Sequence, residues 1–420
     1  MNDITKTTGC RQKMNKTKII NVLQHPPAYE NYRNSPRPEI NWNTPDGNWV
    51  GIWGTDWPDL LGNEIRKLTD EFEYEVWQPD LRADKIYAHR FDSGLKHKLF
   101  PAKTMQNYYG LKKYQQVTSP TIMQAIKNVG TAIIHLNSVN SYLSSAIIKE
   151  IKLPLLIQFH SKSFHPSWER TKLRKNIVKN YYYFILSHTL SKRQCYYVYC
   201  NSHTTKSLKK TNRKRLFMGV DFDKFLKQDL IDSKESLSLP PNKPILLIAS
   251  RFTPGKQIDK VIKIAIKLSK QHDFHLVIAG HGDREYEEYL RALAKPLAAQ
   301  NKASFPGYLS GTTLTEAYSA SNLFISASVA EGGPVSVMKA FACETPVMCT
   351  RVGGVDDIMA ENDAGILVEP FDYEQWEREL QQFFKGKPVK PLDRNIAKKY
   401  FHWPNIANEF IKVYRHLCNA

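Results

Sequence analysis

Two basic residues that could hold a phosphate follow an apolar run in the second half of the chain. The stretch "LLIASRFTPGKQ" places Arg251 and Lys256 on either side of Pro254 and Gly255. The apolar run before them is expected to be a buried strand. Two cations in the loop at the carboxyl end of a parallel strand can bind a phosphate or a diphosphate. The alternative is a loop that is simply basic and solvated.

A second motif joins an acidic residue to two glycines. In "AEGGPVSVMK", Glu331, Gly332, Gly333 and Pro334 lead into an expected helix. Proline suits the first helical position, and glycines let backbone N–H groups approach an anion at a helix N-terminus. A carboxylate beside this glycine loop (residues 331–334) would repel phosphate. Glu331 is therefore expected to accept hydrogen bonds from neutral hydroxyls, as on a sugar, with an ordinary loop glutamate as the alternative.

Short β-rich runs alternate with amphipathic helical patterns along the chain, which predicts parallel sheets with helical crossovers. The expected strands are residues 18–24, 74–78, 131–135, 154–160, 196–201, 244–250, 275–279, 303–306, 323–326, 346–350 and 365–368. The stretch "LSLPPNKP" (residues 237–244) disfavours helix and interior strand, so it is the expected linker. The sequence therefore predicts an α/β protein with two doubly wound domains and a ligand cleft between them.

The positive charge is concentrated in the first half of the chain. Residues 1–250 carry 38 Lys and Arg against 21 Asp and Glu, whereas residues 251–420 carry 21 against 20. An anionic partner for the N-terminal half, such as an anionic membrane surface, is one interpretation, and a solvated basic face is the other. The basic stretch "KSLKKTNRKR" (residues 206–215) lacks stacking aromatics, so no nucleic-acid partner is expected.

Cysteine usage and the N-terminus indicate a reducing compartment. The six cysteines form no CxxC pair, which argues against a zinc ribbon or a dense disulfide framework. The polar, basic N-terminus is not a signal peptide, and no run approaches the roughly 18 apolar residues of a transmembrane helix. A cytoplasmic location is expected, either free or peripheral on the inner face of the membrane.

Five stretches, in this order, resemble the donor domain of the retaining glycosyltransferases of family 4, within the glycosyl transferases group 1. They are "SRFTPGKQIDKVI", "LVIAGHGDREYEEYL", "FPGYLSGTTLTEAYSASNLFISAS", "EGGPVSVMKAFACETPV" and "RVGGVDDIM". The resemblance implies the GT-B fold, in which two Rossmann-like domains face a central cleft. Residues 1–240 would bind the acceptor and residues 241–395 the nucleotide-sugar donor. Residues 396–420 would end in a helix that can pack back on the N-terminal domain.

The resemblance also implies roles at the donor site. Arg251 and Lys256 would neutralise the donor diphosphate, and Gly332 and Gly333 would bind the diphosphate or the sugar through backbone amides. Glu331 matches the first glutamate of the family's E-x7-E motif, which typically contacts the donor-sugar hydroxyls.

Further positions match the family outside these two loops. Tyr308 and Leu309, in "FPGYL", match the backbone that lines the base pocket. His160, at the end of "LPLLIQFH", matches a histidine that faces the reacting sugar, so His160 and Glu331 are the expected catalytic residues. His135, which closes the preceding strand, is a further candidate on the acceptor side. For each histidine the alternative is a satisfied structural residue.

The implied reaction is transfer of a hexosyl group (EC 2.4), with retention, from a nucleotide-sugar to a glycan or lipid-linked acceptor, as in polysaccharide biosynthesis. No cofactor is expected. No metal is expected either, because no DxD pair stands at a strand end and "DFD" (residues 221–223) precedes a helix in the connecting region. Arg251, Lys256 and a helix N-terminus could supply the charge instead. No protein nucleophile is obvious, which suits a front-side mechanism in which the leaving phosphate takes the acceptor's proton.

The acceptor side departs from the family pattern. Where the family usually has a Gly-Gly loop after the first strand, this chain has a long stretch in which Gly51 and Gly54 are the nearest substitutes. Trp53 offers a flat face that suits a sugar ring, although tryptophans are more often core or loop anchors. The stretch "SWERTKLRKNIVKNYYYFILSHTLSKRQ" could lie on an anionic membrane surface or pack as a helix on the N-terminal sheet.

Position 339 is a second departure. The E-x7-E motif places its second glutamate eight residues after Glu331, where this chain has Lys339. That glutamate typically accepts hydrogen bonds from both ribose hydroxyls, which a lysine cannot copy because its ammonium only donates. Altered ribose recognition with retained phosphate binding is therefore expected. Glu344 also stands where the family usually has a helix-end glycine.

Two other functions stay open on the sequence. One is a GT-B protein that has lost turnover and acts as a binding or regulatory partner. The other is another GT-B enzyme, such as a sugar-nucleotide epimerase or a phosphorylase, although the carboxylate-rich site and cofactor lysine that those enzymes need are not recognisable.

Overall fold

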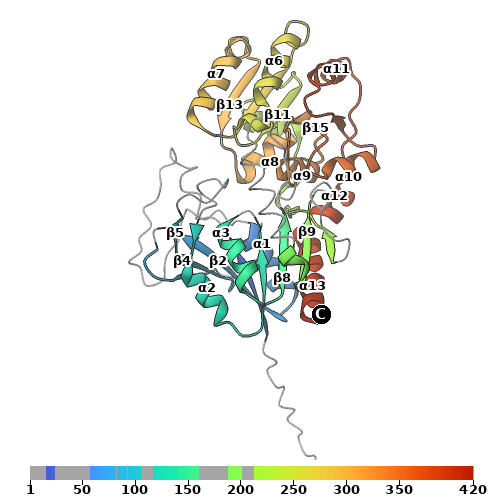
Figure 1. The fold of residues 1–420 in the computed structure, drawn as a ribbon. Helices are drawn as coiled ribbons and strands as arrows, with labels where there is room; N and C mark the ends of the chain where they lie inside the picture. The colour runs from blue at the N-terminus through green and yellow to red at the C-terminus, as the bar shows by residue number, and fades with distance from the viewer. Residues whose placement is uncertain are drawn as a thin grey trace, which may run out of the picture.

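The computed structural model describes residues 16–23, 57–81, 83–91, 93–105, 117–137, 139, 141–159, 188–200 and 212–419. Within these ranges the chain forms two large sheets, one from each half of the sequence. Figure 1 shows the N-terminal sheet in blue and green and the C-terminal domain in yellow to red. No helix in the described part of the chain is both long and apolar enough to span a bilayer.

The N-terminal sheet has eight strands in the described ranges and is parallel except for its edge strand β3. In spatial order the strands are β10 (Arg213–Arg215), β9 (Cys195–Tyr199), β8 (Leu155–Phe159), β7 (Ala132–Leu136), β1 (Thr17–Val22), β2 (Phe72–Asp80), β4 (Lys96–Pro101) and β3 (Tyr87–Arg90). A small hairpin, β5 (Lys103–Thr104) with β6 (Val117–Thr118), lies beside it. The strand order reverses between β1 and β7, which is the pattern of a doubly wound sheet.

Both faces of this sheet are covered, as a parallel sheet requires. Helices α2 (Pro120–Lys127) and α3 (Tyr142–Glu150) contribute to the core on one face. Helices α1 (Trp57–Leu68) and α13 (Trp403–Asn419) contribute to the core on the other. The C-terminal helix thus packs against the N-terminal sheet, as the red helix beside β8 and β9 in Figure 1 shows.

The C-terminal sheet has six strands within residues 212–419, and all neighbouring pairs are parallel. In spatial order they are β13 (Ala303–Gly307), β12 (His275–Ala279), β11 (Ile245–Ala249), β14 (Leu323–Ser326), β15 (Val347–Thr350) and β16 (Ile366–Val368). Following the chain from β11, the next two strands, β12 and β13, lie on one side of it. After β13 the chain returns to add β14, β15 and β16 on the other side.

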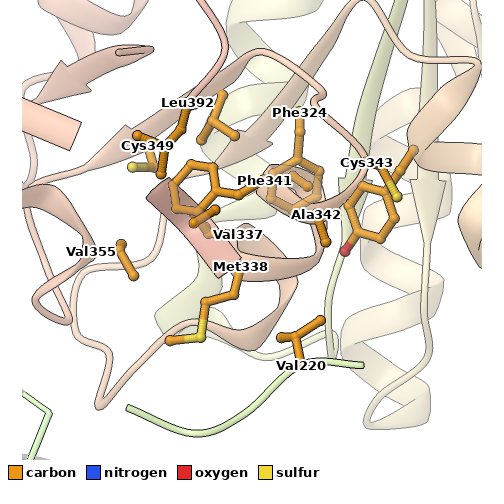
Figure 2. Close-up of a cluster of buried hydrophobic side chains, with 14 of the residues drawn as sticks. Val220, Phe324, Val337, Met338, Phe341, Ala342, Cys343, Cys349, Val355 and Leu392 are labelled. Carbon is orange, nitrogen blue, oxygen red and sulfur yellow. The ribbon is translucent and has the colours of Figure 1, made fainter. Parts of the chain in front are cut away.

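Two hydrophobic cores cover the C-terminal sheet. One contains residues of α6 (Ile258–Leu268), α7 (Arg284–Ala298) and α11 (Tyr373–Phe384). The other contains residues of α8 (Gly311–Ser319), α9 (Val335–Ala342), α10 (Val355–Glu361) and α12 (Arg394–Phe401). Figure 2 shows the second core, with Val337, Met338 and Phe341 of α9 among the buried side chains. This packing anchors α9 along its length.

The two halves are joined by two segments that lie side by side. Val220 of the first connection donates its N–H to the carbonyl of Phe401 at 2.7 Å and pairs with His402 in a parallel bridge. Phe217, Val220 and Phe222 are buried in the C-terminal core. The first connection therefore packs on the C-terminal core well before the stretch at residues 237–244, because its aromatic residues are buried there. Helix α5 (Leu230–Ser236) continues it.

All the strands expected from the sequence are present, with ends that differ by no more than two residues in the described ranges. The α/β prediction with two doubly wound sheets is thereby confirmed. The prediction missed β3, β4, β5, β6 and β10. These strands are short or carry several charged residues, and they are extended mainly because they pair with a neighbour.

Helix α9 ends at a residue in the left-handed region. Glu344 has a φ of 52°, and it follows the C-cap residue Cys343. The N–H of Glu344 donates to the carbonyl of Phe341, and that of Thr345 donates to Ala340, at 3.0 and 2.9 Å. This is the Schellman arrangement, in which glycine is the usual residue because it has no Cβ to strain.

Replacing Glu344 by glycine is therefore expected to stabilise the protein. We expect a gain of about 0.5–1 kcal/mol, because the left-handed strain is removed at a small cost in unfolded-state entropy. Urea unfolding of Glu344→Gly measures it. Ala292→Gly, at an exposed position within α7, is the matched control and should lose about 1 kcal/mol. An equal loss in both variants would contradict the interpretation.

Candidate functional site

The reversal of strand order in the C-terminal sheet coincides with a pocket. It lies at the carboxyl ends of β11 and β14, where the two outgoing loops separate. Crevices of this kind are the usual ligand sites of open α/β sheets. The polar residues that line it are Ser250, Lys256, Ser326, Ser328 and Ser336.

Lys256 reaches this pocket from a short 3-10 turn, Pro254–Lys256, that follows β11. The N–H of Val329 donates to the carbonyl of Gly255 at 3.0 Å, so the loops after β11 and β14 are joined through their backbones. Arg251, the other predicted phosphate ligand, has an exposed side chain in the same loop. The loop thus presents one partly buried cation and one exposed cation.

The glycine loop is shaped by positive φ angles and by a close neighbour. Gly333 has a φ of 138° and Gly353, in the loop after β15, has a φ of 83°. A Cβ atom on Gly353 would lie 2.9 Å from Glu331 Cβ and 2.7 Å from Pro334 Cδ, so only glycine fits beneath the loop. Pro334 is the N-cap of α9, one residue before the helical position expected from the sequence, because its ψ of 94° is extended.

Lys256 and Glu331 meet in the structure. Lys256 Nζ lies 2.5 Å from Glu331 Oε1, and the two side chains are only 24% and 14% exposed. Such a partly desolvated pair is held together more strongly than a surface ion pair. Gly332 and Gly333 are adjacent to the carboxylate in the chain. The pocket edge therefore combines a cation, a carboxylate and a glycine-rich backbone turn.

The predicted base-pocket residues follow β13. Tyr308 is 69% exposed, and its ring makes an edge contact with His281, with 5.2 Å between centroids. Leu309 is partly buried against the C-terminal core. The N–H of Gly280 donates to the carbonyl of Gly307 at 2.7 Å, which joins the loops after β12 and β13. An exposed aromatic ring is thus available at the strand ends on this side of the pocket.

Lys339 lies one turn after the pocket residue Ser336 on α9, and residues three apart share a helix face. Its ammonium lies 4.9 Å from the ring centroid of Phe225, in the first connection between the domains. Burial lowers the pKa of Lys339, and the neighbouring Cys343 opposes that shift. A cation over an aromatic face is attracted to it, so this lysine holds α9 to the connecting segment.

His135 is completely buried. Its Nδ1 lies 2.9 Å from the hydroxyl of Tyr414, its Nε2 lies 3.0 Å from Gln158 Oε1, and its ring stacks on Phe410. Tyr414 and Phe410 belong to α13, so this histidine joins the C-terminal helix to the N-terminal sheet. The ring faces a core in this structure rather than an acceptor surface.

Four predicted site residues lie outside the described residues. They are Gly51, Trp53, Gly54 and His160. The acceptor side of the site and the catalytic histidine therefore stay predictions.

The structure adds residues that the sequence analysis did not single out. Four serines bring hydroxyls to the pocket, and Gly353 supports the glycine loop from below. A small polar residue at the end of an apolar strand was the available signal for Ser250 and Ser326.

The "DFD" stretch (residues 221–223) forms a turn, in which Asp221 Oδ1 accepts hydrogen bonds from the N–H groups of Asp223 and Lys224. Across the described ranges, no three His, Cys, Asp or Glu side chains cluster as a metal site would require.

Residues 231–402 match the family model of the glycosyl transferases group 1. An uncharacterized glycosyltransferase of Methanocaldococcus jannaschii is 30% identical over 193 residues, which cover 45% of this chain and 49% of that protein. The D-inositol 3-phosphate glycosyltransferase of Acidothermus cellulolyticus is 29% identical over 209 residues, covering 47% and 46%. The match thus spans about half the length of these curated relatives.

Solved structures resemble the whole chain. The sucrose-phosphate synthase of Thermosynechococcus elongatus superposes with a TM-score of 0.71 at 17% identity, over 96% of this chain and 100% of that one. Anabaena HepE, in complex with UDP and glucose, superposes with a TM-score of 0.66 at 15% identity, over 95% and 99%. These superpositions show that the chain has the GT-B fold.

The partly buried ammonium of Lys339 predicts a pH-dependent stability difference. Burial lowers the pKa of Lys339 in the folded protein, whereas in the unfolded chain the pKa is about 10.4. Just below pH 10.4 the unfolded chain therefore binds more protons than the folded chain. The free energy of unfolding then rises with pH in this range. Lys339→Met removes this dependence. The stability of the unmodified protein relative to Lys339→Met should therefore rise as the pH approaches about 10.4 from below.

Urea unfolding of both proteins at several pH values measures this difference. Lys263→Met, at an exposed position of α6, controls for the loss of one positive charge. A difference that falls with rising pH would mean that the fold favours the charged form, against the burial argument.

Proposed function

We propose that this chain is a glycosyltransferase that binds a nucleotide-sugar donor at the carboxyl ends of β11 and β14. The group 1 family match and the GT-B fold support it, as does a similar protein that holds UDP and glucose. The observation that carries the proposal is the Lys256–Glu331 pair beside the Gly332–Gly333 turn, at the reversal of strand order. It joins a cation that lines the pocket to a carboxylate in the neighbouring loop, and we propose that the first binds phosphate and the second binds hydroxyls.

The diphosphate would lie against the loop after β11 and the start of α9. Lys256 supplies a charged donor, and the exposed Arg251 can approach from the same loop. We propose that the backbone N–H groups of Gly332 and Gly333 and the positive end of the α9 dipole also contact the diphosphate. This set of groups favours a dianionic leaving group, and its charge is stabilised as the glycosidic bond breaks.

Glu331 would bind the donor sugar. When Lys256 turns to the diphosphate, the carboxylate of Glu331 is freed to accept hydrogen bonds from sugar hydroxyls. Recognition of phosphate and of sugar would therefore be coupled through one ion pair. Tyr308 and Leu309 are proposed to border the base. Because Lys339 cannot accept, we propose that the ribose hydroxyls are held by other groups.

We further propose transfer with retention, as in family 4, with hexosyl transfer as the reaction type. His160 and Glu331 would face the reacting sugar, and the leaving phosphate would take the acceptor's proton. Neither a metal nor a cofactor is proposed, because Lys256, Arg251 and the α9 N-terminus supply the positive charge. The acceptor would be a glycan or a lipid-linked glycan, met by the basic N-terminal half at a cytoplasmic membrane surface, as in polysaccharide biosynthesis.

Two variants, each of which removes one charge of the Lys256–Glu331 pair, test the donor site. Lys256→Met is expected to weaken UDP binding roughly 10- to 100-fold, because a charge-assisted hydrogen bond of about 1.5–3 kcal/mol is lost. Glu331→Gln should bind UDP at least as tightly as the unmodified protein, since Lys256 is then unpaired. The same variant should lose sugar transfer roughly 100-fold. Titration calorimetry with UDP, ADP and GDP, together with nucleoside diphosphate release from sugar nucleotides, measures both effects.

Lys263→Met, which removes a lysine from the exposed side of α6, is the control for charge alone. If Lys256→Met binds all three nucleotides as the unmodified protein does, the diphosphate does not bind here. If Glu331→Gln weakens binding as much as Lys256→Met, the two residues act only as a structural pair.

Metal removal tests the proposed source of positive charge. Nucleoside diphosphate release from the preferred sugar nucleotide should be unchanged after dialysis against a chelator. Arg251→Ala should slow it roughly tenfold, because one cation near the leaving group is lost. Loss of the reaction on chelation, with recovery on adding Mg²⁺ or Mn²⁺, would show that a metal supplies that charge.

A further inference from the structure

The carboxyl end of the N-terminal sheet touches the donor-side loops directly. Cys200 follows β9 and is buried. A Cβ atom on Gly333 would lie 3.4 Å from Cys200 Sγ, and one on Gly354 would lie 2.4 Å from the Cys200 carbonyl oxygen. Figure 1 shows β9 ending below α9 and α10 at this junction. The two domains therefore meet at the glycine loop and at the turn beneath it.

One arginine spans this junction. Arg215, the last residue of β10, donates from Nε to the Cys200 carbonyl at 3.3 Å and from Nη2 to the Gly354 carbonyl. Its Nη2 also lies 2.9 Å from Asp357 Oδ2, and its guanidinium lies 5.0 Å from the Phe217 ring centroid. A planar fork with several donors can make these contacts together, which a lysine cannot.

The partners of Arg215 lie directly beneath the glycine loop. Gly354 is the N-cap of α10, and Asp357 lies in the first turn of that helix. The preceding residue, Gly353, is in close contact with Glu331 and Pro334, as the short Cβ distances there show. A shift of the Gly353–Gly354 turn would therefore move the carboxylate of Glu331.

We propose that Arg215 is a positioning residue for the transfer reaction. It ties the end of the N-terminal sheet to the Gly353–Gly354 turn, and so sets where the Glu331 carboxylate stands relative to the domain that presents the acceptor. This inference rests on the proposed function. Arg215 belongs to the basic stretch "KSLKKTNRKR", for which no nucleic-acid partner is expected. Its contacts give this one residue a specific structural task.

The neighbouring Lys214 provides a matched control. It lies on the same strand, and its ammonium pairs with Glu409 of α13, on the N-terminal side of the junction. Removing it costs one cation and one ion pair without touching the Gly353–Gly354 turn. A change in kcat or in radius of gyration that follows substitution of Arg215 but not of Lys214 is therefore due to the loss of the link between the domains.

Three variants test the proposal: Arg215→Gln, Arg215→Lys and Lys214→Met. Arg215→Gln should bind UDP as the unmodified protein does but lower kcat roughly 10- to 100-fold, because a small displacement of reacting groups has such an effect. Arg215→Lys should recover part of the loss through Asp357, and Lys214→Met should leave kcat unchanged. Small-angle scattering should show a larger radius of gyration for Arg215→Gln only.

The outcomes separate this inference from the proposed function. Normal kcat in Arg215→Gln, or an equal loss in Lys214→Met, overturns the positioning role. Loss of UDP affinity in Arg215→Gln as large as its loss of kcat also overturns it, since the residue would then be part of the donor site. If the unmodified protein releases no nucleoside diphosphate from any donor, the proposed function fails. The scattering difference between Arg215→Gln and Lys214→Met then decides whether Arg215 links the domains.

Discussion

The C-terminal sheet adds strands on both sides of β11, and the helices that follow must then cover opposite faces. Because the chain leaves β11 toward one face and β14 toward the other, their outgoing loops separate and cannot fill the space between them. Lys256 enters this space from one loop and Glu331 from the other. The hydrogen bond from the N–H of Val329 to the carbonyl of Gly255 keeps the two loops at a fixed separation. The pocket, the ion pair and the position of α9 all depend on this one reversal.

Two lysines near the pocket have partners within the protein. Lys256 is balanced by Glu331, and Lys339 faces the ring of Phe225. A dianionic leaving group would compete with the first pair, whereas the second cation already belongs to the connecting segment. The ammonium of Lys339 is thus used in packing against the connecting segment, and its side chain offers no hydrogen-bond acceptor.

The junction between the halves is built from close contacts of backbone and side-chain groups. The two connections run beside each other at Val220 and His402, and a Cβ atom on Gly219 would meet the ring of Trp403 at 2.1 Å. Arg394 donates to carbonyls of Phe222 and Phe225 and so fixes the first connection to α12. Together with Arg215, these contacts connect the N-terminal sheet to the glycine loop through hydrogen bonds and an ion pair.

The sequence by itself determined the strands that are apolar runs and the doubly wound pattern, since strands buried on both faces of a parallel sheet need nearly continuous apolar residues. It could not reveal β4 or β10, because their charged residues become strands only by pairing with β2 and β9. Only the tertiary structure brought Lys256 to Glu331, 75 residues away, and Lys339 to Phe225. Contacts between distant segments depend on how the sheet reverses, and no local pattern encodes that geometry.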